Sequence, residues 1–126
     1  MVVNDFKDLE PVLKEENTLA IVINIEGGHC FANRVLSEEK PMDEQYQKDM
    51  LAHLQIVKDW EYRPLYVTVV HHFYNGISGN TKSFPPGIAS KNLDQSYMLG
   101  TDMTPFGEQF IDLLLDNSEG KRILVD

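Results

Sequence analysis

The sequence predicts an α/β protein built from parallel β/α units, and three observations lead to this prediction. Two nearly unbroken apolar runs rich in β-branched residues, at 19–25 and 65–70, are typical of strands in a parallel sheet. Amphipathic helical patterns alternate with these runs, as parallel connections require. The 126 residues make up about half of the roughly 250 residues of an eight-stranded β/α barrel. We therefore expect one segment over residues 1–126, belonging to an open sheet or to a barrel.

A cap, a proline and an apolar run predict the first helix and the first strand. Asp8 can cap a short helix over about residues 9–16, and Pro11 then falls in its first turn, where a missing N–H is tolerated. The run LAIVINI at 19–25 follows this helix. Because the run is apolar at nearly every position, it predicts a strand that is buried on both faces and stops at Glu26.

A second helix and a second strand follow in the middle of the chain. Residues 43–60 carry apolar side chains at helical spacing, and Asp43 is placed to cap them. This apolar stripe consists of Tyr46, Met50, Leu54 and Val57. The run LYVTVV at 65–70, introduced by Pro64, then predicts a second buried strand that ends at His71.

The last third of the chain predicts a long loop, a third helix and a third strand. The loop covers about residues 71–103 and is far longer than the usual connection of about 2–6 residues, so we expect it to form part of a site. Thr104 and Pro105 are a good cap and first residue for the third helix. Residues 122–125 then begin a third strand, which ends at Asp126.

Composition and charge argue against several classes of protein. The chain has 20 acidic and 11 basic residues, and its formal net charge of -9 disfavours binding to nucleic acid. No apolar run reaches the roughly 20 residues that a membrane span requires. The start, MVVNDFKDLE, lacks the pattern of a secretory signal, so a cytoplasmic location is the default expectation. The single cysteine, Cys30, cannot form an internal disulfide, and we expect it to be a small buried residue.

A titratable residue stands at the end of each predicted strand. Glu26 closes the first strand, His71 the second and Asp126 the third. Because the carboxyl ends of parallel strands converge on one face, these three residues are candidates for a shared site. Polar residues also end strands by chance, so the pattern alone leaves both interpretations open.

Glu26 is the most informative of the three, because it follows an apolar strand and precedes two glycines that allow backbone or ligand to approach closely. A buried carboxylate needs a metal ion, an Arg or Lys side chain, or a proton beside it. Glu26 is therefore the candidate metal ligand. The plainer interpretation is a hydrated carboxylate on the rim, or one that caps the next turn.

The histidines have different candidate roles. His71 directly ends the second strand, and an imidazole there can donate a hydrogen bond to a carbonyl oxygen that gains charge during hydrolysis, so His71 is the candidate catalytic residue. If strand geometry persists, His72 points to the opposite side and is a solvent-facing or loop-packing residue. For His29 we favour packing or support of the site over direct metal binding. His53 is expected on the surface of the second helix.

Three segments occur in an order that is typical of one known family. They are IVINIEGGHCF at 21–31, LYVTVVHHFYN at 65–75, and the stretch from LGTDMTPFGEQFIDLLLD to RILVD at 99–126. This order resembles that of the membrane (renal) dipeptidases of the amidohydrolase superfamily. The family has an apolar strand ending in Glu-Gly-Gly-His, a strand of Tyr-x-Thr-x-x-His type, and a Gly-Leu-Thr-x-Phe-Gly helix leading to a strand that ends in Asp.

The resemblance implies a central fragment of a TIM-type (β/α)8 barrel with part of a binuclear zinc site, which cleaves dipeptides or small amides by attack of a metal-bound hydroxide. By position in the motifs, Glu26 would bridge the two zinc ions and His71 would bind the substrate carbonyl. The other metal ligands of the family, a His-x-Asp pair on an earlier strand and two histidines on later strands, match no segment here. We therefore expect the chain to be inactive by itself.

Two alternatives stay open at this point. The stretch between Glu26 and His71 is longer than the family pattern, as if residues around 34–48 were inserted, so either His71 or His72 can be the functional histidine. The chain can also be a self-contained α/β module that binds a ligand or a protein without chemistry. Three parallel strands leave two open sheet edges, through which copies of the chain can associate.

Overall fold

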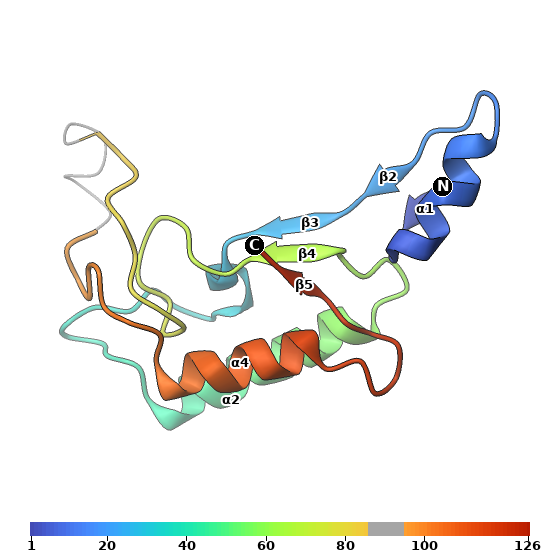
Figure 1. The fold of residues 1–126 in the computed structure, drawn as a ribbon. Coiled ribbons are helices and arrows are strands. Elements are labelled where there is room, and N and C mark those ends of the chain that lie inside the picture. Colours follow the sequence, from blue (N-terminus) through green and yellow to red (C-terminus); the bar gives the residue numbers. More distant parts are fainter. Residues whose placement is uncertain (86–94) are drawn as a thin grey trace.

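The structure is a computed structural model that describes residues 1–85 and 95–126, and it shows a mixed α/β fold (Figure 1). Helices and strands alternate along the chain, and every strand pair among these residues is parallel. The elements are β1 (Val2–Val3), α1 (Phe6–Lys14), β2 (Ile21–Val22), β3 (Asn24–Glu26), η1 (Gly28–Phe31), α2 (Glu44–Asp59), β4 (Tyr66–Thr68), α4 (Pro105–Leu115) and β5 (Leu124–Val125). The prediction of alternating parallel β/α units is confirmed.

The order of the strands in space follows their order in the chain. In the larger sheet β3 pairs with β4 and β4 pairs with β5, so that Glu26 lies opposite Thr68, and Val67 lies opposite Val125. In the smaller sheet β1 pairs with β2, which is separated from β3 by the single residue Ile23. The described residues form no closed barrel.

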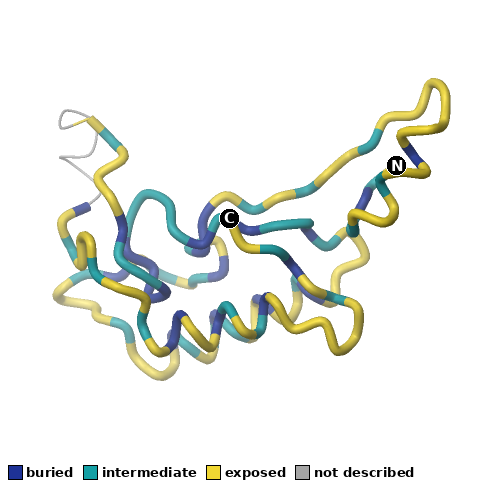
Figure 2. Tube along the Cα trace, in the orientation of Figure 1, coloured by how far each residue is buried: buried dark blue, intermediate teal, exposed yellow. Residues whose placement is uncertain are grey.

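The two long helices cover one face of the larger sheet. α2 and α4 lie side by side along this face, and no helix of the described residues covers the other (Figure 1). The helices contribute the fully buried side chains of Met50, Leu54, Phe110 and Leu114. Val67 of β4 belongs to the same core and is fully buried, whereas Tyr66 and Thr68 on either side of it are half-buried (Figure 2). One face of the sheet is therefore left open.

The second and third helices begin at the predicted caps. At the start of α2, the Asp43 carboxylate accepts a hydrogen bond of 2.7 Å from the backbone N–H of Tyr46. At the start of α4, the Thr104 hydroxyl oxygen accepts one of 2.8 Å from the backbone N–H of Gly107. None of the helices in the described part of the chain is both long enough and apolar enough to cross a bilayer.

The first helix differs from its prediction. α1 begins at Phe6, because Asp5 and not Asp8 is the cap: its side chain accepts a hydrogen bond of 3.2 Å from the backbone N–H of Lys7. Pro11 consequently lies inside the helix and not in its first turn. The preceding strand, β1, has no counterpart among the predictions, because two residues are too few to show an alternating pattern.

The strand predicted over residues 19–25 is wrong in its extent and in its burial. The run divides into β2 and β3, and Leu19 lies outside both. Leu19, Ile21 and Val22 are all exposed. The β-branched residues do favour extended backbone here, but burial on both faces would require a second layer of helices, which the described residues do not supply.

The other two strands are also shorter than predicted, and the long loop is only partly described. β4 and β5 occupy the middle of the run at 65–70 and the end of the run at 122–125. Of the predicted loop over residues 71–103, residues 86–94 lie outside the described part. The described remainder contains one isolated parallel bridge, between Asn80 and Leu99.

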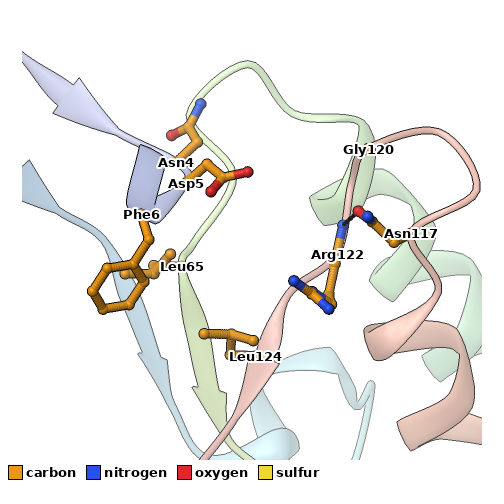
Figure 3. Close-up of a pocket in the computed structure, with 8 residues that line it drawn as sticks. All are labelled: Asn4, Asp5, Phe6, Leu65, Asn117, Gly120, Arg122 and Leu124. Atoms are coloured by element: carbon orange, nitrogen blue, oxygen red, sulfur yellow. Dashed lines mark hydrogen bonds between the residues drawn. The ribbon is translucent and has the colours of Figure 1, made fainter. Parts of the chain in front are cut away.

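A small hollow of about 90 Å³ lies at the amino ends of β4 and β5 (Figure 3). Its lining includes Leu65 and Leu124, and the side chains of Asp5 and Arg122 point into it from the start of α1 and from the turn before β5. Because the strands are parallel, this hollow and Glu26 lie at opposite ends of the sheet.

Candidate functional site

Glu26 and His71 lie together at the carboxyl ends of β3 and β4. Glu26 is the last residue of β3, and His71 follows the end of β4 by three residues. The Nε2 atom of His71 lies 3.1 Å from Oε1 of Glu26. An ionised carboxylate only accepts hydrogen bonds, so Nε2 carries the proton and donates it. The second oxygen of Glu26 has no hydrogen-bond partner among the described residues, and it is therefore open to another ligand.

Glu26 is not buried, contrary to the expectation from its apolar strand. Its side chain is 66% exposed, whereas that of His71 is 27% exposed. The reason is that nothing among the described residues covers the open face of the sheet. No Lys or Arg within residues 1–85 and 95–126 forms an ion pair with Glu26. An exposed carboxylate can be hydrated by solvent, so Glu26 does not by itself need a metal ion or a basic partner.

Asp126 joins the same edge of the sheet through Thr68. The backbone N–H of Asp126 donates to the carbonyl oxygen of Val67 at 3.0 Å and so extends the pairing of β5 with β4. Thr68 lies opposite Glu26 in the sheet, and its hydroxyl donates to Oδ2 of Asp126 at 3.1 Å. The three strand-end residues expected to converge do lie on one edge. Thr68, between the two carboxylates, was missed because its position depends on the strand register.

The two glycines after Glu26 let the chain turn closely against β4. The backbone N–H of Gly27 donates to the carbonyl oxygen of Thr68 at 2.8 Å, and that of Gly28 donates to Val69 at 3.1 Å. Gly27 has a φ of 107°, a conformation that favours glycine. A Cβ atom on Gly28 would lie 2.6 Å from the carbonyl oxygen of Val69. The close backbone approach predicted from the glycine pair is confirmed, and it holds Glu26 beside β4.

His72 lies against His71 with the two ring planes inclined by 48°, and it does not point away from His71. The ring centroids of the two histidines are 3.4 Å apart. The prediction of opposite directions assumed strand geometry, but β4 already ends at Thr68. The Nδ1 atom of His72 lies 2.8 Å from the Ser83 hydroxyl oxygen, and its ring centroid is 4.2 Å from that of Phe84. Burial lowers the pKa of the His72 imidazole, His71 lowers it further and the Glu26 carboxylate acts in the opposite sense.

His29 packs beside this site. Its ring bends back over Gly27, where any Cβ atom would collide with it, and its centroid lies 4.8 Å from that of Phe73. The Nδ1 atom of His29 is buried and has no hydrogen-bond partner within residues 1–85 and 95–126. Burial lowers the pKa of this imidazole, and the neighbouring His71 and His72 lower it further. His29 is therefore a neutral histidine at pH 7.

Cys30 is exposed, and the expectation that it is buried is wrong. It belongs to the short helix η1, in which Gly28 and Phe31 occupy the buried positions. Its side chain consequently points to solvent, and its sulfur lies 4.0 Å from the carbonyl oxygen of Glu26.

Asn75 anchors the chain after the two histidines, and no sequence pattern singled it out. Its side chain is buried, its Nδ2 donates to the carbonyl oxygen of Val69 at 2.6 Å, and its Oδ1 accepts from the backbone N–H of Ile77 at 3.0 Å. Its own carbonyl oxygen accepts a hydrogen bond of 2.9 Å from the Tyr46 hydroxyl of α2. These bonds fix the loop that carries His71. An Asn in a loop is a common turn residue, so only its burial reveals this role.

The described residues do not make a zinc site by themselves. Among them, no group of three His, Cys, Asp or Glu side chains is placed to hold a metal ion. Zinc takes about four ligands in proteins, or three with a water molecule. Glu26 offers one free carboxylate oxygen, and His71 uses its Nε2 proton to bind Glu26. A metal ion at this edge would require ligands in addition to Glu26.

Comparisons of the chain with protein families, with curated proteins and with solved structures give no match. The functional interpretation therefore depends on the residues at the strand ends and on the three ordered segments of the sequence.

Proposed function

We propose that this chain is part of a zinc-dependent, dipeptidase-like hydrolase in which Glu26 is a metal ligand and His71 binds the substrate carbonyl. The observation that carries the proposal is the 3.1 Å contact between Glu26 and His71 at the carboxyl ends of neighbouring parallel strands. Functional groups of parallel α/β folds gather at this end. The three segments that resemble the membrane dipeptidases supply the expected chemistry, the hydrolysis of a dipeptide or small amide.

The proposal includes a TIM-type (β/α)8 barrel as the parent fold. A barrel places each strand beside the next one in sequence, whereas a doubly wound sheet reverses its strand order. The order β3, β4, β5 is sequential, and α2 and α4 cover the same face, as helices of a barrel do. The open face that carries Glu26 and Thr68 would then line the inside of the barrel.

His71 has a donor suited to the proposed role. Its Nε2–H now binds Glu26, and a carboxylate engaged by zinc would leave this proton for the oxygen of the scissile carbonyl, where negative charge develops. Zinc, when bound, lowers the pKa of a water molecule and polarises a carbonyl group. The further zinc ligands would come from residues beyond this chain. A hollow of about 280 Å³ beside Tyr66, Leu124 and Asp126 adjoins the same edge of the sheet.

The test uses two forms of the protein, the 126-residue chain and a form extended along its reading frame at both ends. We expect the extended form to bind zinc and to cleave dipeptides until a chelator is added, and the shorter form to do neither. In the extended form, His71→Ala should lower kcat by about 10²–10³-fold, the usual cost of losing such a donor. His53→Ala, on the surface of α2, is the matched control and should leave kcat unchanged. An extended form without zinc and without hydrolysis contradicts the proposal.

A module that binds a ligand or protein without chemistry is the second candidate. The observation that favours it is the 66% exposure of the Glu26 side chain, since a hydrated carboxylate needs no metal ion. The two candidates differ in the solution behaviour of the 126-residue chain. A soluble monomer that unfolds cooperatively supports the module, whereas aggregation or association through strand edges supports the incomplete barrel.

A further inference from the structure

Side-chain hydrogen bonds hold Ser83, Phe84 and Gln95 together beside His72. The buried Gln95 side chain donates from Nε2 to the carbonyl oxygen of His72 at 2.6 Å and to the Ser83 hydroxyl oxygen at 3.1 Å. Its Oε1 accepts a hydrogen bond of 3.3 Å from the backbone N–H of Phe84. Ser83 in turn lies 2.8 Å from the Nδ1 atom of His72. The buried Gln95 amide therefore links the backbone of His72 to Ser83 and Phe84, and Ser83 also contacts the His72 ring.

Gln95, Ser83 and His72 form one hydrogen-bonded network. Gln95 donates to the oxygen of Ser83, and the Ser83 hydroxyl group can then either donate its proton to the Nδ1 atom of His72 or accept one from it. Burial and the neighbouring His71 lower the pKa of the His72 imidazole, which favours its neutral form. A neutral His72 also spares the two adjacent rings the repulsion of two positive charges.

We propose that His72 is a positioning residue, held by Ser83 and Gln95, that keeps the His71 ring against the Glu26 carboxylate. His72 lies in ring contact with both His71, at 3.4 Å, and Phe84, at 4.2 Å, while its Nδ1 atom is held by Ser83. Its ring therefore has little freedom to rotate. Among the described residues the His71 side chain has one hydrogen bond, to Glu26, so its ring contact with a fixed neighbour restricts the direction in which Nε2 donates. The functional meaning of this restriction rests on the role proposed for His71.

The test is long-range ¹H–¹⁵N NMR of the imidazoles in the 126-residue chain at mildly alkaline pH. The chain has four histidines, so single substitutions assign every signal. In the wild type we expect His71 to show one tautomer, protonated on Nε2, and a nuclear Overhauser contact with His72. In Ser83→Ala, the two nitrogen signals of His71 should average and this contact should be lost. Ser83→Thr keeps a hydroxyl group and should restore both the single tautomer of His71 and its contact with His72.

His53 reports on the fold in the same spectra, because its Nδ1 atom lies 2.7 Å from the carbonyl oxygen of Phe31. Three results overturn the proposal: His71 signals that stay unchanged in Ser83→Ala, His53 signals that change together with them, or a Ser83→Thr chain that restores neither signal. The second result would mean that Ser83 stabilises the whole fold. The spectra depend on neither zinc nor hydrolysis, so an inactive extended form would contradict the proposed function and leave this test intact.

Discussion

Replacing Asn75 with alanine should destabilise the chain strongly, although the residue lies in a loop. The side chain is 1% exposed and makes two hydrogen bonds, to the carbonyl oxygen of Val69 and from the backbone N–H of Ile77. Val69 keeps a second partner, the N–H of Gly28, so the loss there is about 0.5–1.5 kcal/mol. The buried N–H of Ile77 is left without its partner, which costs about 1–3 kcal/mol. Together these terms give about 1.5–4.5 kcal/mol.

Urea denaturation of the 126-residue chain measures this loss. With a slope of about 1–3 kcal/mol per molar urea for small proteins, the midpoint of Asn75→Ala should fall by about 0.5 M or more. Asn33→Ala is the matched control: Asn33 is exposed, and its one side-chain hydrogen bond in the described part of the chain is to the Asp49 carboxylate, so we expect a change within about 0.5 kcal/mol. Equal stability of the two variants would refute the account of Asn75 as the anchor of the loop that carries His71.

Three further variants test other parts of the structure. Gly107→Ala should lower Tm, although alanine favours helices by about 1 kcal/mol, because its Cβ would collide with the carbonyl oxygen of Ile77; a higher Tm contradicts this packing. Asp43→Asn keeps the cap of α2 but removes the ion pair with Arg34, at 2.7 Å. The backbone N–H of Tyr46, and then Arg34, hold the pKa of Asp43 below its ordinary value of 3.8. The Asp43→Asn variant should therefore show its full loss of unfolding free energy above pH 3.8, and this loss should vanish as the pH falls through the lowered pKa. A loss that persists in acid is inconsistent with this account. Val125→Pro removes a backbone N–H that faces the free edge of β5 and should reduce concentration-dependent association in light scattering; unchanged association would show that this edge is not used.

Local signals predicted the two long helices well. Asp43 and Thr104 cap α2 and α4 because their side chains accept hydrogen bonds from backbone N–H groups three residues further on. Contacts between residues so close in the chain can be predicted from the sequence alone. The start of α1 was predicted three residues late, because Asp5 and Asp8 are both acceptable caps and the sequence does not decide between them. The extent and burial of the first strand were also wrong, since they depend on which sheet face the helices cover.

The candidate site was predictable where it depends on topology and not where it depends on register. Parallel strands bring their ends to one edge, so the convergence of Glu26, His71 and Asp126 followed from the pattern of elements. The place of Thr68 between the carboxylates needs the pairing of β3, β4 and β5. The ring contact between His72 and His71 depends on where β4 ends, which a run of apolar residues does not reveal.

The most direct test of the proposed function is the zinc affinity of the extended form, measured by calorimetric titration with and without Glu26→Gln. Glu44→Gln is the control, because Glu44 is an exposed carboxylate on α2 whose ion pair among the described residues is with Lys48. We expect Glu26→Gln to lose at least about tenfold in zinc affinity, since the loss of a group that merely supports a ligand already costs that much. Equal zinc binding by wild type, Glu26→Gln and Glu44→Gln would contradict a metal at the end of β3.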